Sequence, residues 1–232
     1  MHLFRSSVLV SRLTGVFLFA FVSSLSTYAL EWKLQSINFY GTAIELAIPV
    51  DFTPAPADEP RMRFTEKALP PTNRLIAGAI SSVNRGHYCL VQQVVATKEW
   101  RYNAADWNAL LGQFDSTLKG LSMTELSESI NRRVNEALGE QTPGAALRIE
   151  KPVILPAIDS SDHHITFPML LAINFDQSKD SNRQVVLCAV MIFALKGRMV
   201  HAFLYEPFVG KETYTVVAEK AREMAKRTLA AN

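Results

Sequence analysis

The chain contains little cysteine, with only Cys89 and Cys188 among its 232 residues. It has no Cys-x-x-Cys motif, so the usual signature of thiol–disulfide exchange is missing. It also lacks an Asn-x-Ser/Thr sequon, a Gly-x-Ser-x-Gly elbow, a His-Glu-x-x-His helix, a phosphate-binding loop and a Gly-x-Gly-x-x-Gly turn. These absences leave N-glycosylation and the common enzyme classes without a supporting motif.

The N-terminal residues have the composition of a secretory signal peptide. Arg5 and Arg12 occur without any acidic residue, and a short apolar stretch follows at 13–22. Small side chains at Thr27 and Ala29 suit cleavage after Ala29. An uncleaved anchor is the alternative, but a spanning helix needs about 20 mostly apolar residues. We therefore expect residues 1–29 to be removed and the mature protein to be located in a bacterial periplasm.

The expected mature chain has a formal net charge of zero. Removing residues 1–29 takes away two arginines and leaves 22 Lys and Arg against 22 Asp and Glu. This balance gives no reason to expect nucleic acid or an anionic membrane as a partner. The longest later apolar run, at 185–195, is too short to span a membrane and is typical of a buried strand. Residues 30–232 are expected to form a single domain.

The two cysteines both lie inside strand-like segments. Export would make a disulfide between Cys89 and Cys188 chemically possible. A bridge requires Cα atoms within about 7 Å of one another, which two separate strand interiors rarely provide. We favour two buried thiols over a disulfide.

The hydrophobic pattern of the mature chain predicts an α+β fold. Apolar residues with strand-like spacing occur at 37–48, 74–83, 88–96, 146–155, 165–175, 184–195 and 199–205. Helical spacing occurs in two central segments, 103–118 and 122–138, and again from about residue 211 onward. Because successive strands without intervening helices pair antiparallel, we expect an antiparallel sheet with two central helices and a C-terminal helix packed on it.

Local signals define several boundaries of these elements. Five prolines at 50–71 predict an extended surface connection without long regular elements. Ser122 and Glu125 have the spacing of a capping box and predict the start of the second helix. In the C-terminal helix, an apolar stripe that includes Val217 and Met224 is expected to be buried, and Lys220 is expected to be exposed.

The order of elements resembles that of the PsbP/Mog1-like proteins. The likeness rests on an opening strand that ends in Pro49-Val50-Asp51-Phe52, paired central helices, antiparallel strands and a closing strand-to-helix segment. Members of that group are mostly accessory or scaffold proteins without a catalytic centre. The resemblance therefore implies a role in binding or assembly.

Two segments contain candidate functional side chains. Asp159, Asp162 and His163 combine carboxylates with an imidazole and are candidate ligands of a divalent metal, with a solvated turn as the alternative. His163 and His164 cannot both ligate easily, since neighbouring strand residues point to opposite faces. Asn73 and Arg74 follow two prolines and are a possible recognition group, with turn chemistry before a strand as the alternative.

These observations favour a non-enzymatic accessory or protein-binding module with no cofactor, whose partner is another periplasmic or envelope protein. A carrier of a small or hydrophobic ligand is the alternative, and an apolar cavity between sheet and helices would favour it. A hydrolase is the third hypothesis. It requires a nucleophile, a base and an orienting group that converge in the folded chain.

Overall fold

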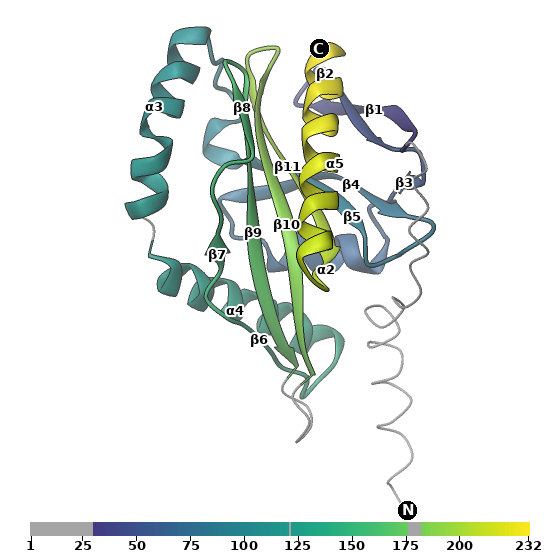
Figure 1. Cartoon of the computed structure of the whole chain (residues 1–232). Coiled ribbons are helices and arrows are strands. Elements are labelled where there is room, and N and C mark those ends of the chain that lie inside the picture. The colour runs from purple at the N-terminus through teal and green to yellow at the C-terminus, as the bar shows by residue number, and fades with distance from the viewer. Residues whose placement is uncertain (1–29, 121, 176–181) are drawn as a thin grey trace, which may run out of the picture.

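The computed structural model describes residues 30–120, 122–175 and 182–232, and the expected signal peptide lies outside these ranges. Figure 1 shows long central strands with α5 and the β1–β2 hairpin on one side and α3 on the other. The elements, in chain order, are β1 (Trp32–Phe39), β2 (Thr42–Pro49), β3 (Phe52–Pro54), α2 (Pro60–Ala68), β4 (Asn73–Ser81), β5 (Tyr88–Val94), a 3₁₀ turn (Val95–Thr97), α3 (Ala104–Gly120), α4 (Met123–Gln141), β6 (Leu147–Ile149), β7 (Val153–Ile154), β8 (Asp159–Ser161), β9 (His164–Phe175), β10 (Asn182–Leu195), β11 (Arg198–Pro207) and α5 (Lys211–Ala230).

Within the described residues the strands form one two-stranded and one nine-stranded sheet. β1 pairs with β2, and the larger sheet has the order β3-β4-β5-β11-β10-β9-β6, with β7 and β8 also paired to β9. Every strand pair is antiparallel. The structure thus confirms the α+β class and the antiparallel sheet.

Both faces of the large sheet carry apolar side chains, but they are covered differently. Along β11, buried residues alternate with half-buried ones. The face formed by Val200, Ala202 and Leu204 belongs to the main core, together with α5 and the β1–β2 hairpin. On the opposite face, Phe203 and Tyr205 are only partly buried and pack against a smaller buried cluster. The second face is therefore where a binding site can form.

Two hairpin turns have the backbone that tight hairpins need. Tyr40 and Gly41 join β1 to β2, and Lys196 and Gly197 join β10 to β11. All four residues have positive φ, as the two central positions of a type I′ turn require. Glycine adopts this conformation without steric cost, which explains its place in both turns.

The expectation of an extended connection at 50–71 is wrong. This segment contains β3 and a nine-residue helix, α2. Pro60 begins the helix, and a first-turn proline loses no hydrogen bond because that N–H has no helical partner. The Glu59 carboxylate accepts hydrogen bonds from the backbone N–H groups of Arg61 at 2.7 Å and Met62 at 3.2 Å. Capping and proline placement together stabilise a helix in a proline-rich segment.

The central helices are confirmed, and one expected strand is divided. At the start of α3 the Asn103 side chain accepts from the Asp106 N–H at 2.9 Å, and Ser122 accepts from the Glu125 N–H at the start of α4. The strand expected at 146–155 is instead two short strands, β6 and β7. Pro152 lies between them, where it cannot donate a ladder hydrogen bond.

The C-terminal helix packs as expected, with one exception. Val217, Ala221 and Met224 are fully buried against the sheet and the β1–β2 hairpin. Lys220, expected to be exposed, instead extends to a buried carboxylate and keeps only 16% of its side chain exposed. The helical period predicts that Lys220, which lies beside the apolar stripe, is exposed. Its long apolar stem can nevertheless run along the apolar surface so that the ammonium group reaches a buried partner.

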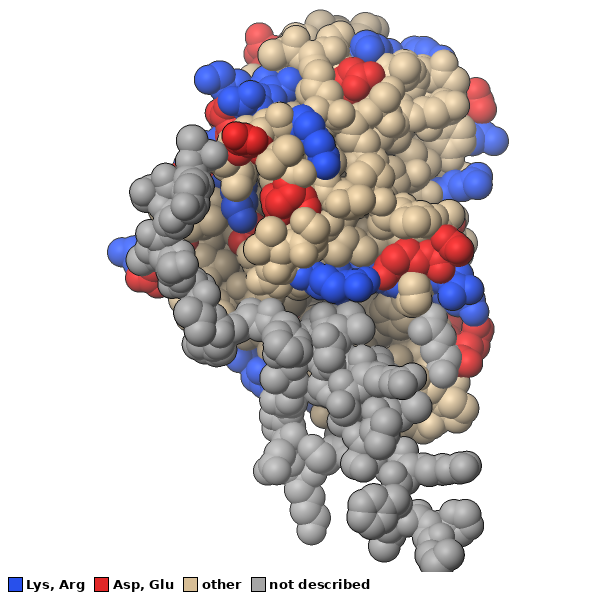
Figure 2. Space-filling model, turned by 90° about the vertical axis from the view of Figure 1, so that its right-hand side faces the viewer, with Lys and Arg blue, Asp and Glu red and all other residues tan. Residues whose placement is uncertain are grey.

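The described surface carries both signs of charge. In Figure 2, Lys and Arg side chains are interspersed with Asp and Glu rather than gathered into a patch of one sign. None of the helices in the described part of the chain is both long enough and apolar enough to cross a membrane.

Candidate functional site

An open groove of about 700 Å³ lies between α3 and the half-covered face of the sheet. Its apolar lining comes from α3, from the loop before it, and from β10 and β11: Trp100, Tyr102, Leu110, Phe114, Ile192 and Met199. Its polar lining is Arg101, Asp106, Gln113, Thr117 and His201. Trp100 is 57% exposed at this site, and tryptophan is enriched at protein interfaces.

Two aromatic side chains, Phe114 and Trp107, anchor α3. The Phe114 ring packs against Phe167 of β9, with ring centroids 5.2 Å apart. Trp107 is fully buried in the first turns of the helix. The face of α3 beyond these anchors leaves Ile192 and Met199 only partly covered.

The loop that carries Trp100 is fixed from beneath by a buried arginine. Arg198 is 3% exposed and donates through Nη1 to the carbonyl oxygens of Lys98 and Trp100. Through Nη2 it also donates to Tyr40 O in the β1–β2 turn at 3.3 Å. The Tyr102 N–H donates to Gly197 O at 2.8 Å. These bonds hold the aromatic loop in place before any ligand arrives, which reduces the entropy lost on binding.

His201 makes the floor of the groove uncharged at neutral pH. Burial lowers the pKa of His201 to about 4, and a hydrogen bond with the Gln92 backbone opposes this shift only in part. The imidazole therefore stays neutral and offers hydrogen bonding without the desolvation cost of a buried cation. A neutral imidazole beside Ile192 and Met199 suits an apolar or aromatic group.

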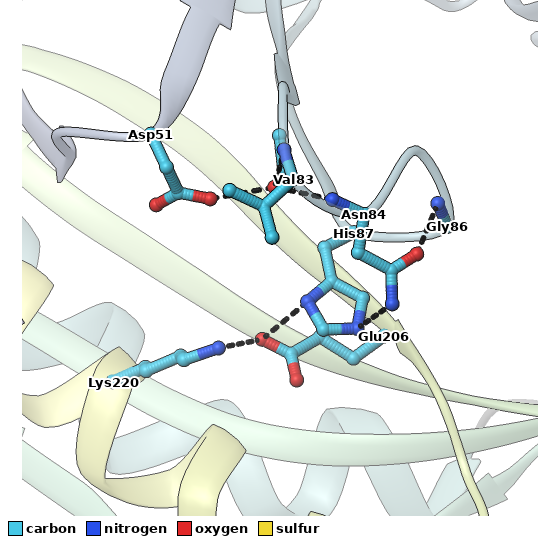
Figure 3. A network of polar contacts seen from close by, with 8 residues as sticks. Asp51, Val83, Asn84, Gly86, His87, Glu206 and Lys220 are labelled. Atoms are coloured by element: carbon cyan, nitrogen blue, oxygen red, sulfur yellow. Dashed lines mark hydrogen bonds and ion pairs between the residues drawn. The ribbon is translucent and has the colours of Figure 1, made fainter. Parts of the chain in front are cut away.

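A second polar feature, a buried ionic cluster, lies at the opposite end of β11 (Figure 3). Glu206 is 3% exposed, and its Oε1 accepts from Lys220 Nζ of α5 at 2.5 Å. His87, from the loop between β4 and β5, places Nδ1 3.7 Å from the same oxygen. The cluster thus joins α5, β11 and that loop around one buried carboxylate.

The neighbours of His87 determine which ring nitrogen carries the proton. Asn84 Nδ2 lies 3.0 Å from His87 Nε2 and can only donate, so Nε2 accepts and the Nδ1 hydrogen points toward Glu206. Burial is the largest cause of the lowered pKa of His87; Lys220 lowers it further, whereas Glu206 and Asp51 raise it. Glu206 is too enclosed for a substrate to reach, so we interpret this cluster as a structural connection.

The possible recognition pair is placed at the start of β4. The Asn73 N–H donates to Pro70 O at 2.8 Å, which closes a turn, and Asn73 Nδ2 lies 3.5 Å from Gln92 Oε1. Arg74 is exposed. Neither residue lines the groove, and turn chemistry accounts for Asn73.

The candidate metal ligands do not come together. Asp159 lies in β8, whereas Asp162 and His163 form the exposed turn that follows. The histidine beside Asp159 is His164, with Nε2 3.2 Å from Asp159 Oδ2. Within the residues that the structure describes, no group of three His, Cys, Asp or Glu side chains is arranged to hold a metal ion.

Cys89 and Cys188 are both free and buried. Cys89 is paired with Leu204 of β11 and Cys188 with Tyr205, so they lie on opposite faces of the sheet with β11 between them. Burial raises the pKa of the Cys89 thiol to about 12 and that of Cys188 still further. Both thiols therefore act as small apolar groups, and neither is a reactive nucleophile.

Sequence reasoning did not identify the groove. Its available signal was the pair of aromatic residues, Trp100 and Tyr102, in a polar loop directly before a helix. The half-covered strand residues Ile192 and Met199 gave no signal, because core strands have the same pattern.

Comparisons with known proteins give only distant matches. No family model and no curated protein matches the chain. Among solved structures, the Ran-binding protein Mog1p of Saccharomyces cerevisiae is 14% identical, with a TM-score of 0.33, over 87% of this chain and 93% of that one. The cyanobacterial PsbP (CyanoP) of a Synechocystis species is 9% identical, with a TM-score of 0.35, over 90% of this chain and 96% of that one. Both halves of the predicted PsbP/Mog1-like resemblance thus occur among the matches.

Proposed function

We propose that this chain is an exported accessory protein that binds another protein of the bacterial envelope through the groove beside α3. The observation that carries the proposal is the open groove of about 700 Å³, with Trp100 at 57% exposure on a loop held by Arg198. Exposed aromatic side chains on a rigid support are typical of the residues that dominate binding energy at protein interfaces.

Export is supported by the composition of residues 1–29, which combines early arginines, a short apolar core and small residues before Leu30. Mass measurement of the protein recovered from a periplasmic fraction tests this part. We expect the mass of a chain that begins at Leu30. A full-length chain in the membrane fraction would contradict export with cleavage.

Binding at the groove is tested by site-specific photocrosslinking in the periplasm. A photoreactive residue replaces Ala109 or Gln113, which line the groove, or Lys226, which is exposed on α5. We expect one specific crosslinked protein from the two groove positions and none from Lys226. Equal patterns from all three positions would contradict the proposal.

A matched pair of variants tests the tryptophan. Trp100→Ala should reduce the crosslinked yield at least about tenfold, as the loss of an interface anchor does. Val83→Ala removes an apolar side chain that is 84% exposed in a distant loop and should leave the yield unchanged.

A carrier of a small apolar ligand is the second candidate, and the volume of the groove favours it, because ligand pockets commonly measure about 300–1,000 Å³. Native mass spectrometry of the purified protein distinguishes the two functions. A bound small molecule that is lost in Trp100→Ala would favour the carrier, and an unloaded protein that still gives the crosslink would favour the protein partner.

A further inference from the structure

The β8–β9 hairpin brings a serine, a histidine and an aspartate onto one face. Ser161 pairs with His164 across the hairpin, and Asp159 lies two residues before Ser161 on the same strand. Residues two apart on a strand, and residues directly opposite in a pair, share a face of the sheet. Ser160 points to the other face, and Asp162 and His163 form the turn.

The three side chains form a continuous chain of hydrogen bonds. Ser161 Oγ lies 2.7 Å from His164 Nδ1, and His164 Nε2 lies 3.2 Å from Asp159 Oδ2. An ionised carboxylate can only accept, so Nε2 carries the ring hydrogen and Nδ1 presents its lone pair. The Ser161 hydroxyl therefore donates to a basic nitrogen.

The three side chains differ in how deeply they are buried. The His164 side chain is 5% exposed, and its ring stacks on Phe193 with centroids 6.1 Å apart, which fixes its orientation. Asp159 is 36% exposed, and Ser161 is exposed to solvent. Arg222 of α5 donates to Ile158 O at 3.2 Å, which places a cation beside the hairpin.

We propose that Ser161 is a nucleophilic serine, activated by His164 as general base, with Asp159 as the positioning residue that holds the imidazole tautomer. This is the convergence of nucleophile, base and orienting group that a hydrolase needs. The ring is turned relative to the usual triad, because Nδ1 rather than Nε2 faces the serine. The site is separate from the groove and does not depend on the proposed binding function.

Activated esters of small acids are the substrate class, since Ser161 is an exposed residue. Ser161 Oγ bonds to the ester carbonyl carbon while its proton passes to His164 Nδ1. The bond from that carbon to the leaving oxygen then breaks, and the leaving oxygen takes the proton from Nδ1. Water, deprotonated by the same nitrogen, attacks the acyl-serine, releases the carboxylic acid and restores the hydroxyl.

The segment Asp159-Ser160-Ser161-Asp162-His163-His164 supplies its own controls, because each member of the relay has a neighbour of the same type outside it. The purified protein is treated with a fluorophosphonate, and the labelled serine is identified by mass spectrometry. We expect the label on Ser161, no label on Ser160 in the Ser161→Ala variant, and an unchanged labelling rate in Ser160→Ala.

Variants of the base and the positioning residue complete the test. His164→Ala and Asp159→Asn should slow labelling of Ser161 and hydrolysis of p-nitrophenyl acetate about 100-fold, the usual contribution of a general base. His163→Ala and Asp162→Asn should change neither rate, and added imidazole should partly restore His164→Ala. Circular dichroism checks folding, and Asp159→Asn, being partly exposed, remains informative if His164→Ala does not fold. Labelling that is absent from Ser161, or equal in Asp159→Asn and Asp162→Asn, would overturn the proposal.

Discussion

Replacing Lys220 with methionine tests whether the buried ionic cluster supports the fold. Lys220 Nζ lies 2.5 Å from Glu206 Oε1, and the two side chains are only 16% and 4% exposed. The substitution keeps most of the apolar stem and removes the charge, so Glu206 loses its closest cation. We expect the free energy of unfolding to fall by about 3 kcal/mol, the lower end of the usual cost of breaking a buried pair.

The magnitude follows from distance and burial. At 2.5 Å the Coulomb attraction is about 7 kcal/mol with an effective dielectric constant near 20, and desolvation of both ions offsets much of it. His87 Nδ1, 3.7 Å from the same oxygen, can take up a proton and compensate in part. The pKa of His87 should accordingly rise in the variant, because Lys220 lowers it and Glu206 raises it in the parent protein.

Urea denaturation and NMR titration of His87 measure both effects. Lys226→Met, at an exposed position of the same helix, is the matched control and should change stability by less than about 0.5 kcal/mol. Adding Glu206→Gln to Lys220→Met should recover part of the loss, since no buried charge then remains unpaired. Equal effects of the two lysine variants, with no recovery in the double variant, would refute the reasoning.

Three further substitutions test the core, the groove and the loop clamp. Val217→Asp should cost on the order of 3 kcal/mol or more by burying an unpaired charge, whereas Val216→Asp, at a position 40% exposed, should cost far less; denaturant midpoints of the two variants compare them. The pKa of His201 is lowered to about 4 in the folded chain, so as the pH falls His201 is protonated in the unfolded chain before it is protonated in the folded one. The contribution of neutral His201 to the free energy of unfolding should be fully present above about pH 6.5 and should fall by on the order of 3 kcal/mol as the pH drops toward 4. Calorimetry should find this pH-dependent loss missing in His201→Gln. Arg198→Lys loses the fork that serves the Trp100 and Tyr40 carbonyls and should cost about 2 kcal/mol, read as a lower melting temperature; an unchanged melting temperature would contradict the clamp.

The sequence by itself determined the features that depend on near neighbours. Gly41 and Gly197 mark turns because glycine adopts positive φ without steric cost, which is a property of the residue itself. Ser122 marks the start of α4 because its partner, the Glu125 N–H, is three residues away. The stripe around Val217 marks a buried helix face because the helical period is a local property. The fold class followed from such signals taken together.

Only the tertiary structure decided features whose partners lie far along the chain. Lys220 finds Glu206 fourteen residues away on another element, and Arg198 reaches Trp100 O across 98 residues. Asp159 and His164 are only five residues apart, yet the sequence left His163 and His164 as alternatives, and the register of β8 on β9 selected His164. The groove depends on how far α3 stands from β10 and β11. No local pattern encodes that spacing, because it is set by the packing of side chains, such as Phe114 on Phe167, between helix and sheet.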